Sequence, residues 1–329
     1  MKKLLQFILI RAIFSMVLSA EEWDYVHIDY TFENDADVRK DRWYTQGGKL
    51  SVLLHRKDVA EDDWLQIPYM QSFDREHYIN FALVQQMYTP ENFETTDIMQ
   101  GDRPYAGWLY LQAVIMQTSA RHYDAVTFKA GVTGKHSQME YVQRFIHWLI
   151  GSPSPNGWEN QLDTRIGIQF DYQHKWRFVP DDMWGIESDI IPFVEGNLGF
   201  IDMKATTGAM WRLGYNIPEN FGAGPIDEYG EDNVPAGQTA TYRHKSKWSY
   251  YVNLGVGGSA VLYDYFMDAK TLSGEQLVDK NYLHAFGSYG LSIRYDAYLL
   301  SYIRTHYSDM YQTQAESSSF GSLHFSYIF

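Results

Sequence analysis

Residues 321–329, GSLHFSYIF, decide the fold class of this chain. Large apolar side chains occupy every second position, at Leu323, Phe325, Tyr327 and Phe329. The positions between them hold His324, Ser326 and Ile328. Alternation with a period of two is typical of a β-strand that has one apolar face. The sequence therefore predicts that the chain ends in a strand.

Similar alternation recurs along the rest of the chain. We predict twelve strands, at residues 25–32, 43–56, 76–87, 105–118, 121–132, 160–177, 187–201, 203–215, 248–267, 283–295, 297–308 and 319–329. An even number of strands closes an up-and-down barrel, and the 26 tyrosines suit the aromatic girdles of transmembrane barrels. We predict an all-β fold, a 12-stranded antiparallel transmembrane β-barrel of the bacterial outer membrane. The alternative is a soluble β-sandwich in which residues 319–329 form an edge strand.

The N-terminal residues 1–20 have the layout of a secretory signal peptide. Two lysines precede an apolar run, which ends in the small residues Ser19 and Ala20. An uncleaved membrane anchor is the alternative, although the run is short for a membrane span. We expect export through this signal to the outer membrane, and a mature protein that is one barrel domain over residues 21–329.

The composition excludes several functions. Residues 1–20 hold 3 of the 27 basic residues and no acidic residue, so 24 basic and 41 acidic residues give the mature chain a net charge of −17. Such an acidic chain is not expected to bind nucleic acid. The absence of cysteine excludes disulfides and thiolate nucleophiles, and no GxSxG motif supports a serine nucleophile.

Residues 137–151, SQMEYVQRFIHWLIG, predict the one clear helix of the chain, beside the barrel wall. Ser137 is a favourable N-cap, and Glu140 three residues later completes a capping box. Gly151 predicts a left-handed C-terminal stop. Met139, Val142, Ile146 and Leu149 repeat on one side, and Glu140, Gln143, Arg144 and His147 repeat on the other.

Gln143 and His147 lie one turn apart on the polar side of this helix. A neutral imidazole can take a proton from water, which is the requirement for a general base. The two side chains are therefore a candidate reaction centre. The alternative is an ordinary surface helix whose polar side is solvated.

The end of the first strand is rich in hard oxygen ligands, the type that calcium prefers. The candidates are Glu33, Asn34, Asp35, Asp37 and Asp41. A divalent cation there could stabilise an oxyanion. Acidic loops are common, and Asn34 with Asp35 could equally form a simple turn.

Several ordered stretches resemble the outer-membrane lipid A 3′-O-deacylases, a family of LpxR-like enzymes. They are FEND (residues 32–35), RWYTQGGKLS (42–51), QMYTPENF (86–93), GDRPYAGWLYL (101–111) and GVTGKHSQMEYVQRFIHWLIGSPSPNGWENQL (131–162). They cover the first half of the mature chain, whereas the second half matches only as barrel strands.

This resemblance implies a calcium-dependent outer-membrane esterase that removes a 3′-linked acyl group from lipid A of lipopolysaccharide. It implies that His147 activates water, that Gln143 and Thr45 belong to the active site, and that Asn34 and Asp35 lie near Ca²⁺. In such enzymes the site lies between the barrel wall and the helix. Phe32 and Asn34 would then share one face of the first strand. We expect a monomer that acts on lipid in the outer leaflet.

The sequence leaves four points open. No Lys or Arg lies between Tyr88 and Gly101, although phosphate recognition generally uses basic side chains, so an outer-membrane phospholipase is an alternative. A porin-like barrel with an incidental His147 is another. Thr45 could be ordinary strand packing. Asp102 and Arg103 could form a structural ion pair at the corner that Pro104 makes, or they could belong to the site.

One long connection, residues 216–245, is rich in Gly, Pro and Asp. Its segment IDEYGEDN, at residues 226–233, is acidic, and we predict that it is exposed to solvent.

Overall fold

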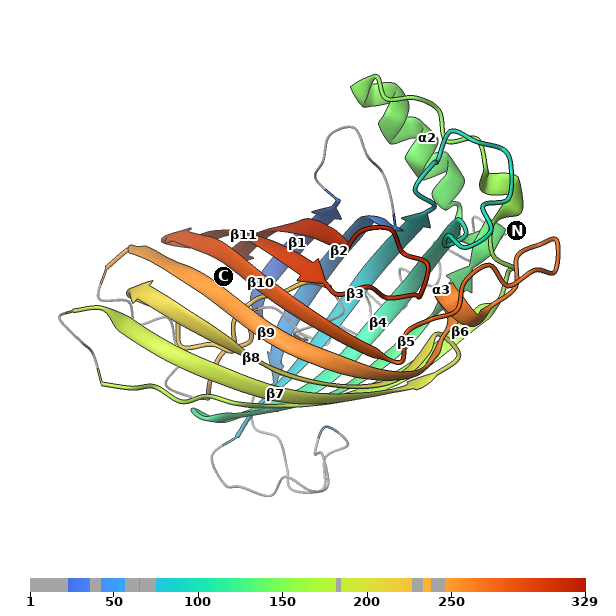
Figure 1. Cartoon of the computed structure of the whole chain (residues 1–329). Helices are drawn as coiled ribbons and strands as arrows, with labels where there is room; N and C mark the ends of the chain where they lie inside the picture. Colours follow the sequence, from blue (N-terminus) through green and yellow to red (C-terminus); the bar gives the residue numbers. More distant parts are fainter. Residues whose placement is uncertain are drawn as a thin grey trace.

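The computed structural model forms a closed barrel of twelve antiparallel strands (Figure 1). The structure describes residues 23–35, 43–56, 65, 75–181, 185–226, 233–237 and 246–329. The predicted signal peptide lies outside these residues. The strands are β1 (Trp23–Asn34), β2 (Trp43–Arg56), β3 (Glu76–Thr89), β4 (Ala106–Thr118), β5 (His122–Thr133), β6 (Ile166–Trp176), β7 (Glu187–Gly199), β8 (Asp202–Tyr215), β9 (Trp248–Asp264), β10 (Leu283–Tyr295), β11 (Tyr298–Tyr307) and β12 (Ser319–Ile328).

Each strand pairs with its sequence neighbours, and β1 pairs with β12 to close the sheet. All twelve predicted strands are confirmed, and two boundaries move most. β6 begins at Ile166 instead of residue 160, and β9 ends at Asp264 because the short helix α3 (Tyr265–Asp268) follows it. None of the helices in the described part of the chain is both long and apolar enough to span a membrane.

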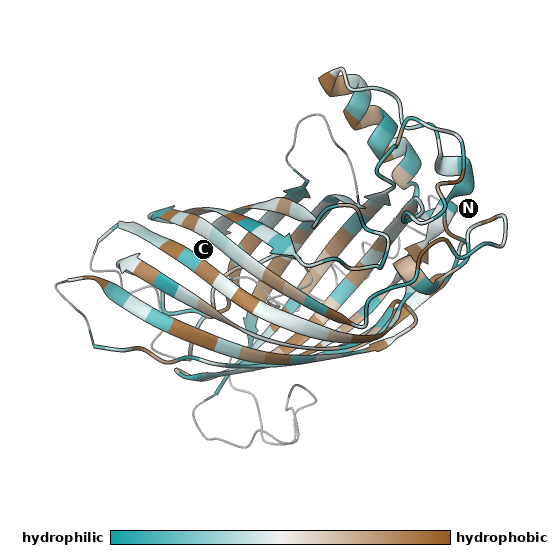
Figure 2. Cartoon of the chain, viewed as in Figure 1, coloured by the Kyte–Doolittle hydropathy of each residue, from teal (hydrophilic) through white to brown (hydrophobic). Residues whose placement is uncertain are grey.

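Hydrophobic and hydrophilic residues alternate along the strands (Figure 2), and they point to opposite faces of the sheet. In β12, Leu323, Phe325 and Tyr327 are exposed on the outside, whereas Ser322, His324 and Ser326 are buried in the barrel. In β1, Ile28 and Tyr30 are exposed and Asp29 and Glu33 are buried. Apolar outside and polar inside is the pattern of a barrel surrounded by lipid. The alternative of a soluble sandwich is therefore wrong.

The connection between β8 and β9 packs inside the barrel. Phe221 joins a buried cluster with inward side chains of several strands, and its ring lies 5.4 Å from that of Tyr123. Further along, the backbone N–H of Ile226 donates to Glu33 Oε1 at 2.9 Å. Ile226 and Asn233 are both buried, so our prediction that residues 226–233 are exposed is wrong at its two ends. Residues 227–232 lie outside the described residues.

A buried ionic group holds this internal segment, which we call the plug (residues 216–226 and 233–237). Arg212 donates to both carboxylate oxygens of Asp189 and to the side chain and carbonyl of Asn220 in the plug. Arg177 donates to the same Asp189 at 2.8 Å. One carboxylate therefore compensates two guanidinium groups, and all three are buried.

Three loops, at residues 90–105, 269–282 and 308–318, meet across the barrel end that lies opposite the chain termini. We call them the joined loops. Gly101 N donates to Leu277 O at 3.0 Å, and Thr313 Oγ1 donates to Gly101 O at 2.5 Å. The hydroxyl of Tyr311 donates to Asp102 Oδ1 at 2.7 Å. Burial and the Asp102 charge raise the pKa of Tyr311 above its ordinary value, so this hydroxyl keeps its proton. Asp102 thus links two of these loops through a hydrogen bond, which supports the structural alternative for this residue.

Removing the shared carboxylate should loosen the plug. We expect Asp189→Ala to lower the free energy of unfolding by about 3–5 kcal/mol, because Arg212 and Arg177 would remain buried without their anion. Urea titration of the heat-modifiable gel band in detergent measures this. Asp296→Ala is the matched control, because its partner Lys247 lies in an exposed pair. Equal midpoints for the two variants would contradict the role of Asp189.

Candidate functional site between the barrel wall and helix α2

Helix α2 (Met139–Ile150) packs against the outer surface of the barrel. Trp108 lines a cavity in the lumen, so its neighbours Gly107 and Leu109 in β4 face outward. A Cβ at Gly107 would overlap Ser137 Oγ and the Met139 side chain. The missing side chain of Gly107 therefore lets the base of α2 approach the wall. In Figure 1, the helix projects beside the ends of β3 and β4.

The helix begins later than the sequence predicts. Residues Gly134–Ser137 form a 3-10 turn, and Gln138, with a φ of 65°, is the N-cap. Ser137 Oγ donates to Gly134 O at 2.6 Å, and Glu140 accepts from Arg144. The predicted capping box is therefore wrong, because the buried Ser137 closes the preceding turn instead. The predicted stop at Gly151 is confirmed, with a φ of 72°.

Two residues of the polar side of α2, Gln143 and His147, face the protein. Gln143 and His147 are only 2% and 3% exposed. The alternative of a solvated polar side is therefore wrong for these two residues. On the side that the sequence predicts as apolar, Met139 is buried, Val142 and Ile146 are half-buried, and Leu149 is exposed.

Both buried polar side chains have defined partners. Trp158 Nε1 donates to Gln143 Oε1 at 2.7 Å. His147 Nδ1 lies 2.5 Å from Pro153 O, and the Phe93 ring meets the imidazole edge-on at 5.4 Å. A carbonyl oxygen can only accept, so Nδ1 carries a proton, and in the neutral imidazole the lone pair then lies on Nε2. The loop that follows the helix thus sets His147 in the tautomer that a general base needs.

A second polar group lies at the ends of β1, β2 and β3. Asn34 Nδ2 donates to Thr45 O at 3.0 Å, and Asp35 N donates to the same carbonyl at 3.4 Å. Thr45 sits at a bulge in the β2–β3 pairing, and its hydroxyl lies 2.6 Å from that of Thr89. The bulge turns Thr45 toward Thr89. The structure therefore brings together Asn34, Asp35 and Thr45, which the sequence had singled out separately.

Both groups have supporting residues on the outer face of β3. Gln86 and Tyr88 line the luminal cavity, so Met87 and Thr89 point outward. Met87 is buried in a cluster with Phe93, Met139 and Trp158, which supports α2. Thr89, two residues along, bonds to Thr45. The expected face is also confirmed for Asn34, because Glu33 beside it points into the lumen.

The donors near Asp35 suit calcium in type. One carboxylate, one amide and two hydroxyls are all hard oxygen ligands. Within the described ranges, no three His, Cys, Asp or Glu side chains converge to hold a metal ion. A Ca²⁺ bound here would therefore need backbone or water oxygens as well. Of the other predicted ligands, Glu33 is not part of this group, because its carboxylate points into the lumen and accepts from Tyr44 and Ser322. Asp37 and Asp41 lie outside the described residues.

Comparison with known proteins identifies the family. The family model of outer membrane protein LpxR matches residues 5–329. The chain belongs to the LpxR family. LpxR from Salmonella typhimurium has the same fold, with a TM-score of 0.75 at 19% identity over 92% of this chain and 100% of that one. The translocator domain of autotransporter NalP from Neisseria meningitidis gives 0.44 at 9% identity over 99% and 95%. No curated protein sequence matches the chain.

Membership of the LpxR family places the barrel in the outer membrane, with α2 and the three joined loops on the side opposite the periplasmic termini. The candidate site therefore lies outside the wall, at the extracellular rim. The sequence alone could not identify Trp158, Pro153 and Phe93 as the partners of Gln143 and His147, because they lie in connections without regular spacing.

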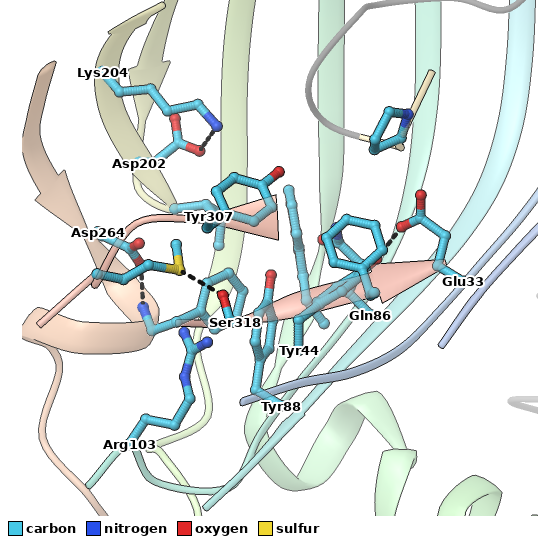
Figure 3. A pocket seen from close by; sticks show the side chains of 16 residues that line it. Glu33, Tyr44, Gln86, Tyr88, Arg103, Asp202, Lys204, Asp264, Tyr307 and Ser318 are labelled. Atoms are coloured by element: carbon cyan, nitrogen blue, oxygen red, sulfur yellow. Dashed lines mark hydrogen bonds and ion pairs between the residues drawn. The ribbon is translucent and has the colours of Figure 1, made fainter. Parts of the chain in front are cut away.

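A separate cavity lies on the inner side of the same wall (Figure 3). Arg103 is buried there with its guanidinium 4.5 Å from the Tyr88 ring centre. Glu33, Asp202, Lys204 and Asp264 line it with aromatic rings. The joined loops lie over this chamber and the plug lies on its other side. Arg103 thus belongs to the lumen and not to the outer site.

A larger side chain at position 107 should displace α2 and leave the barrel intact. We expect Gly107→Val to expose the bond after Arg144 to trypsin several-fold faster, because the new side chain would overlap Ser137 and Met139. Gly196→Ala is the control, since a Cβ placed at Gly196 would meet nothing within 4 Å. Unchanged cleavage with a normal heat-modifiable band would show that Gly107 does not seat the helix.

Proposed function

We propose that the chain is a lipid A deacylase that hydrolyses a 3′-linked acyl ester of lipopolysaccharide in the outer leaflet. The observation that carries the proposal is the contact of the buried His147 Nδ1 with Pro153 O, which leaves Nε2 as the acceptor of the neutral ring. Membership of the LpxR family supports the substrate class. The position of the site at the outer rim suits an ester whose acyl chain stays in the membrane.

The reaction is direct attack by water. His147 Nε2 takes a proton from water as the oxygen adds to the ester carbonyl. When the tetrahedral intermediate collapses, the bond to the sugar oxygen breaks, and the imidazolium returns the proton to that oxygen. The products are a fatty acid and a free 3′-hydroxyl. Pro153 keeps the ring in one orientation throughout.

The oxyanion needs positive charge that His147 does not supply. Asp35 and Asn34 would hold Ca²⁺, which would supply that charge when bound. Thr45 acts as a positioning residue, since its carbonyl accepts from both of them. Gln143 is held by Trp158, and its amide lies one helical turn from His147 on the same buried side.

Two observations bear on the alternatives. The plug and the joined loops fill both sides of the luminal chamber, which argues against a porin-like channel. The lack of Lys and Arg between Tyr88 and Gly101 keeps a phospholipase as the second candidate. Mass spectrometry of lipid A and phospholipids, from cells with and without the protein, separates the two.

Replacing His147 should slow hydrolysis strongly and leave the barrel folded. We expect His147→Ala and His147→Gln each to lose about 10²- to 10⁴-fold in rate, because neither side chain can accept the proton. Wild-type activity should also fall toward acid pH as the imidazole becomes protonated. Released fatty acid, measured by mass spectrometry, gives the rate.

The same assay tests the attacking group. In ¹⁸O water, a single turnover should place one ¹⁸O in the released fatty acid. Unlabelled acid, or near-normal activity of either His147 variant with an intact heat-modifiable band, would contradict direct attack by water.

Replacing Asp35 should weaken calcium binding and raise the calcium concentration that activity requires. We expect Asp35→Ala to lose activity at low calcium and to recover part of it as calcium rises, because a weakened site still fills by mass action. Asp97→Ala, an exposed aspartate of the loop after β3, is the matched control. Full wild-type activity in excess chelator would exclude the metal.

A further inference from the structure

The outward face of α2 is aromatic and exposed. Tyr141, Phe145, Trp148 and Leu149 are between 60% and 76% exposed. They lie opposite Gln143 and His147 on the helix. The rings of Phe145 and Trp148 are neighbours, with centroids 6.0 Å apart. We call these four residues the aromatic face. So much clustered apolar surface is unusual on a helix that faces only water.

The position of the helix indicates what covers this face. α2 packs on the outer side of the wall, above outward residues of β3 and β4. Leu83 and Leu111 on these strands are exposed and belong to the lipid-facing surface of the barrel. The aromatic face therefore continues an apolar surface that already contacts lipid.

The charged residues lie to one side of this face. Glu140 pairs with Arg144 along one flank, and Lys135 and His136 are exposed at the base. A helix with an aromatic face and a charged flank, too short to span, has the pattern of an interfacial membrane helix. Tyr141 and Trp148 are the residue types that prefer the headgroup boundary.

We propose that the aromatic face of α2 inserts into the outer leaflet, at the boundary between headgroups and acyl chains. The membrane, and not a protein partner, then holds the outer side of the helix, while Gly107 and Met139 hold its inner side. The helix would then lie between the lipid of the outer leaflet and the barrel wall. The proposal rests on the location of the barrel and does not require the hydrolysis proposed above.

Spin labels at single cysteines test this directly, because the chain has no cysteine of its own. Phe145→Cys and Trp148→Cys carry the label on the aromatic face, and Glu140→Cys and Arg144→Cys carry it on the charged flank. Each protein is reconstituted in phosphatidylethanolamine–phosphatidylglycerol vesicles, and again with added lipopolysaccharide. The measured quantity is the collision rate with oxygen, which enters lipid, relative to that with a nickel chelate, which stays in water.

We expect oxygen collisions to dominate at positions 145 and 148 and nickel collisions to dominate at 140 and 144, in both vesicle types. Dominant nickel collisions at 145 and 148 would overturn the proposal. So would immobile labels there whose mutual dipolar coupling grows with protein density, because a second copy would then cover the face. If the unsubstituted protein in the lipopolysaccharide vesicles releases no fatty acid while the labels show the expected pattern, that result contradicts the proposed function alone.

Discussion

Closure of the hydrogen-bonded sheet is the constraint on which the rest of the structure depends. Lipid offers no partner to a backbone N–H or C=O, so a strand protein can cross a membrane only as a barrel without edges. Pairing of β1 with β12 completes that closure. Once the sheet is closed, every strand has one side in lipid and one in the lumen, and the period-two alternation of the sequence follows.

Closure also creates an interior that the protein must fill. The buried carboxylate of Asp189 compensates Arg212 and Arg177, and through Arg212 it holds the plug. Above the plug, Asp102 and Tyr311 fasten loops that are far apart in sequence. The lumen is thus occupied by structural polar groups. This leaves the outer surface of the wall as the place for the candidate site.

The site on that outer surface depends on close approach and on loop geometry. Gly107 removes a side chain so that α2 can sit on the wall, and β3 presents Met87 to the helix and Thr89 to Thr45. The two sides of α2 then meet different surroundings. Gln143 and His147 face the protein, where His147 is oriented by Pro153, and the exposed aromatic face is the side that we propose inserts into the leaflet.

The sequence by itself determined the barrel, its twelve strands and the helix, because alternation and helical periodicity are local patterns that lipid and closure reinforce. It also singled out Asn34, Asp35, Thr45, Gln143 and His147. Only the tertiary structure decided how α2 begins, which of its sides is buried, and that residues 226 and 233 lie inside the barrel. These features depend on contacts between distant segments, such as Ser137 against Gly107 and Ile226 with Glu33, which no local spacing encodes.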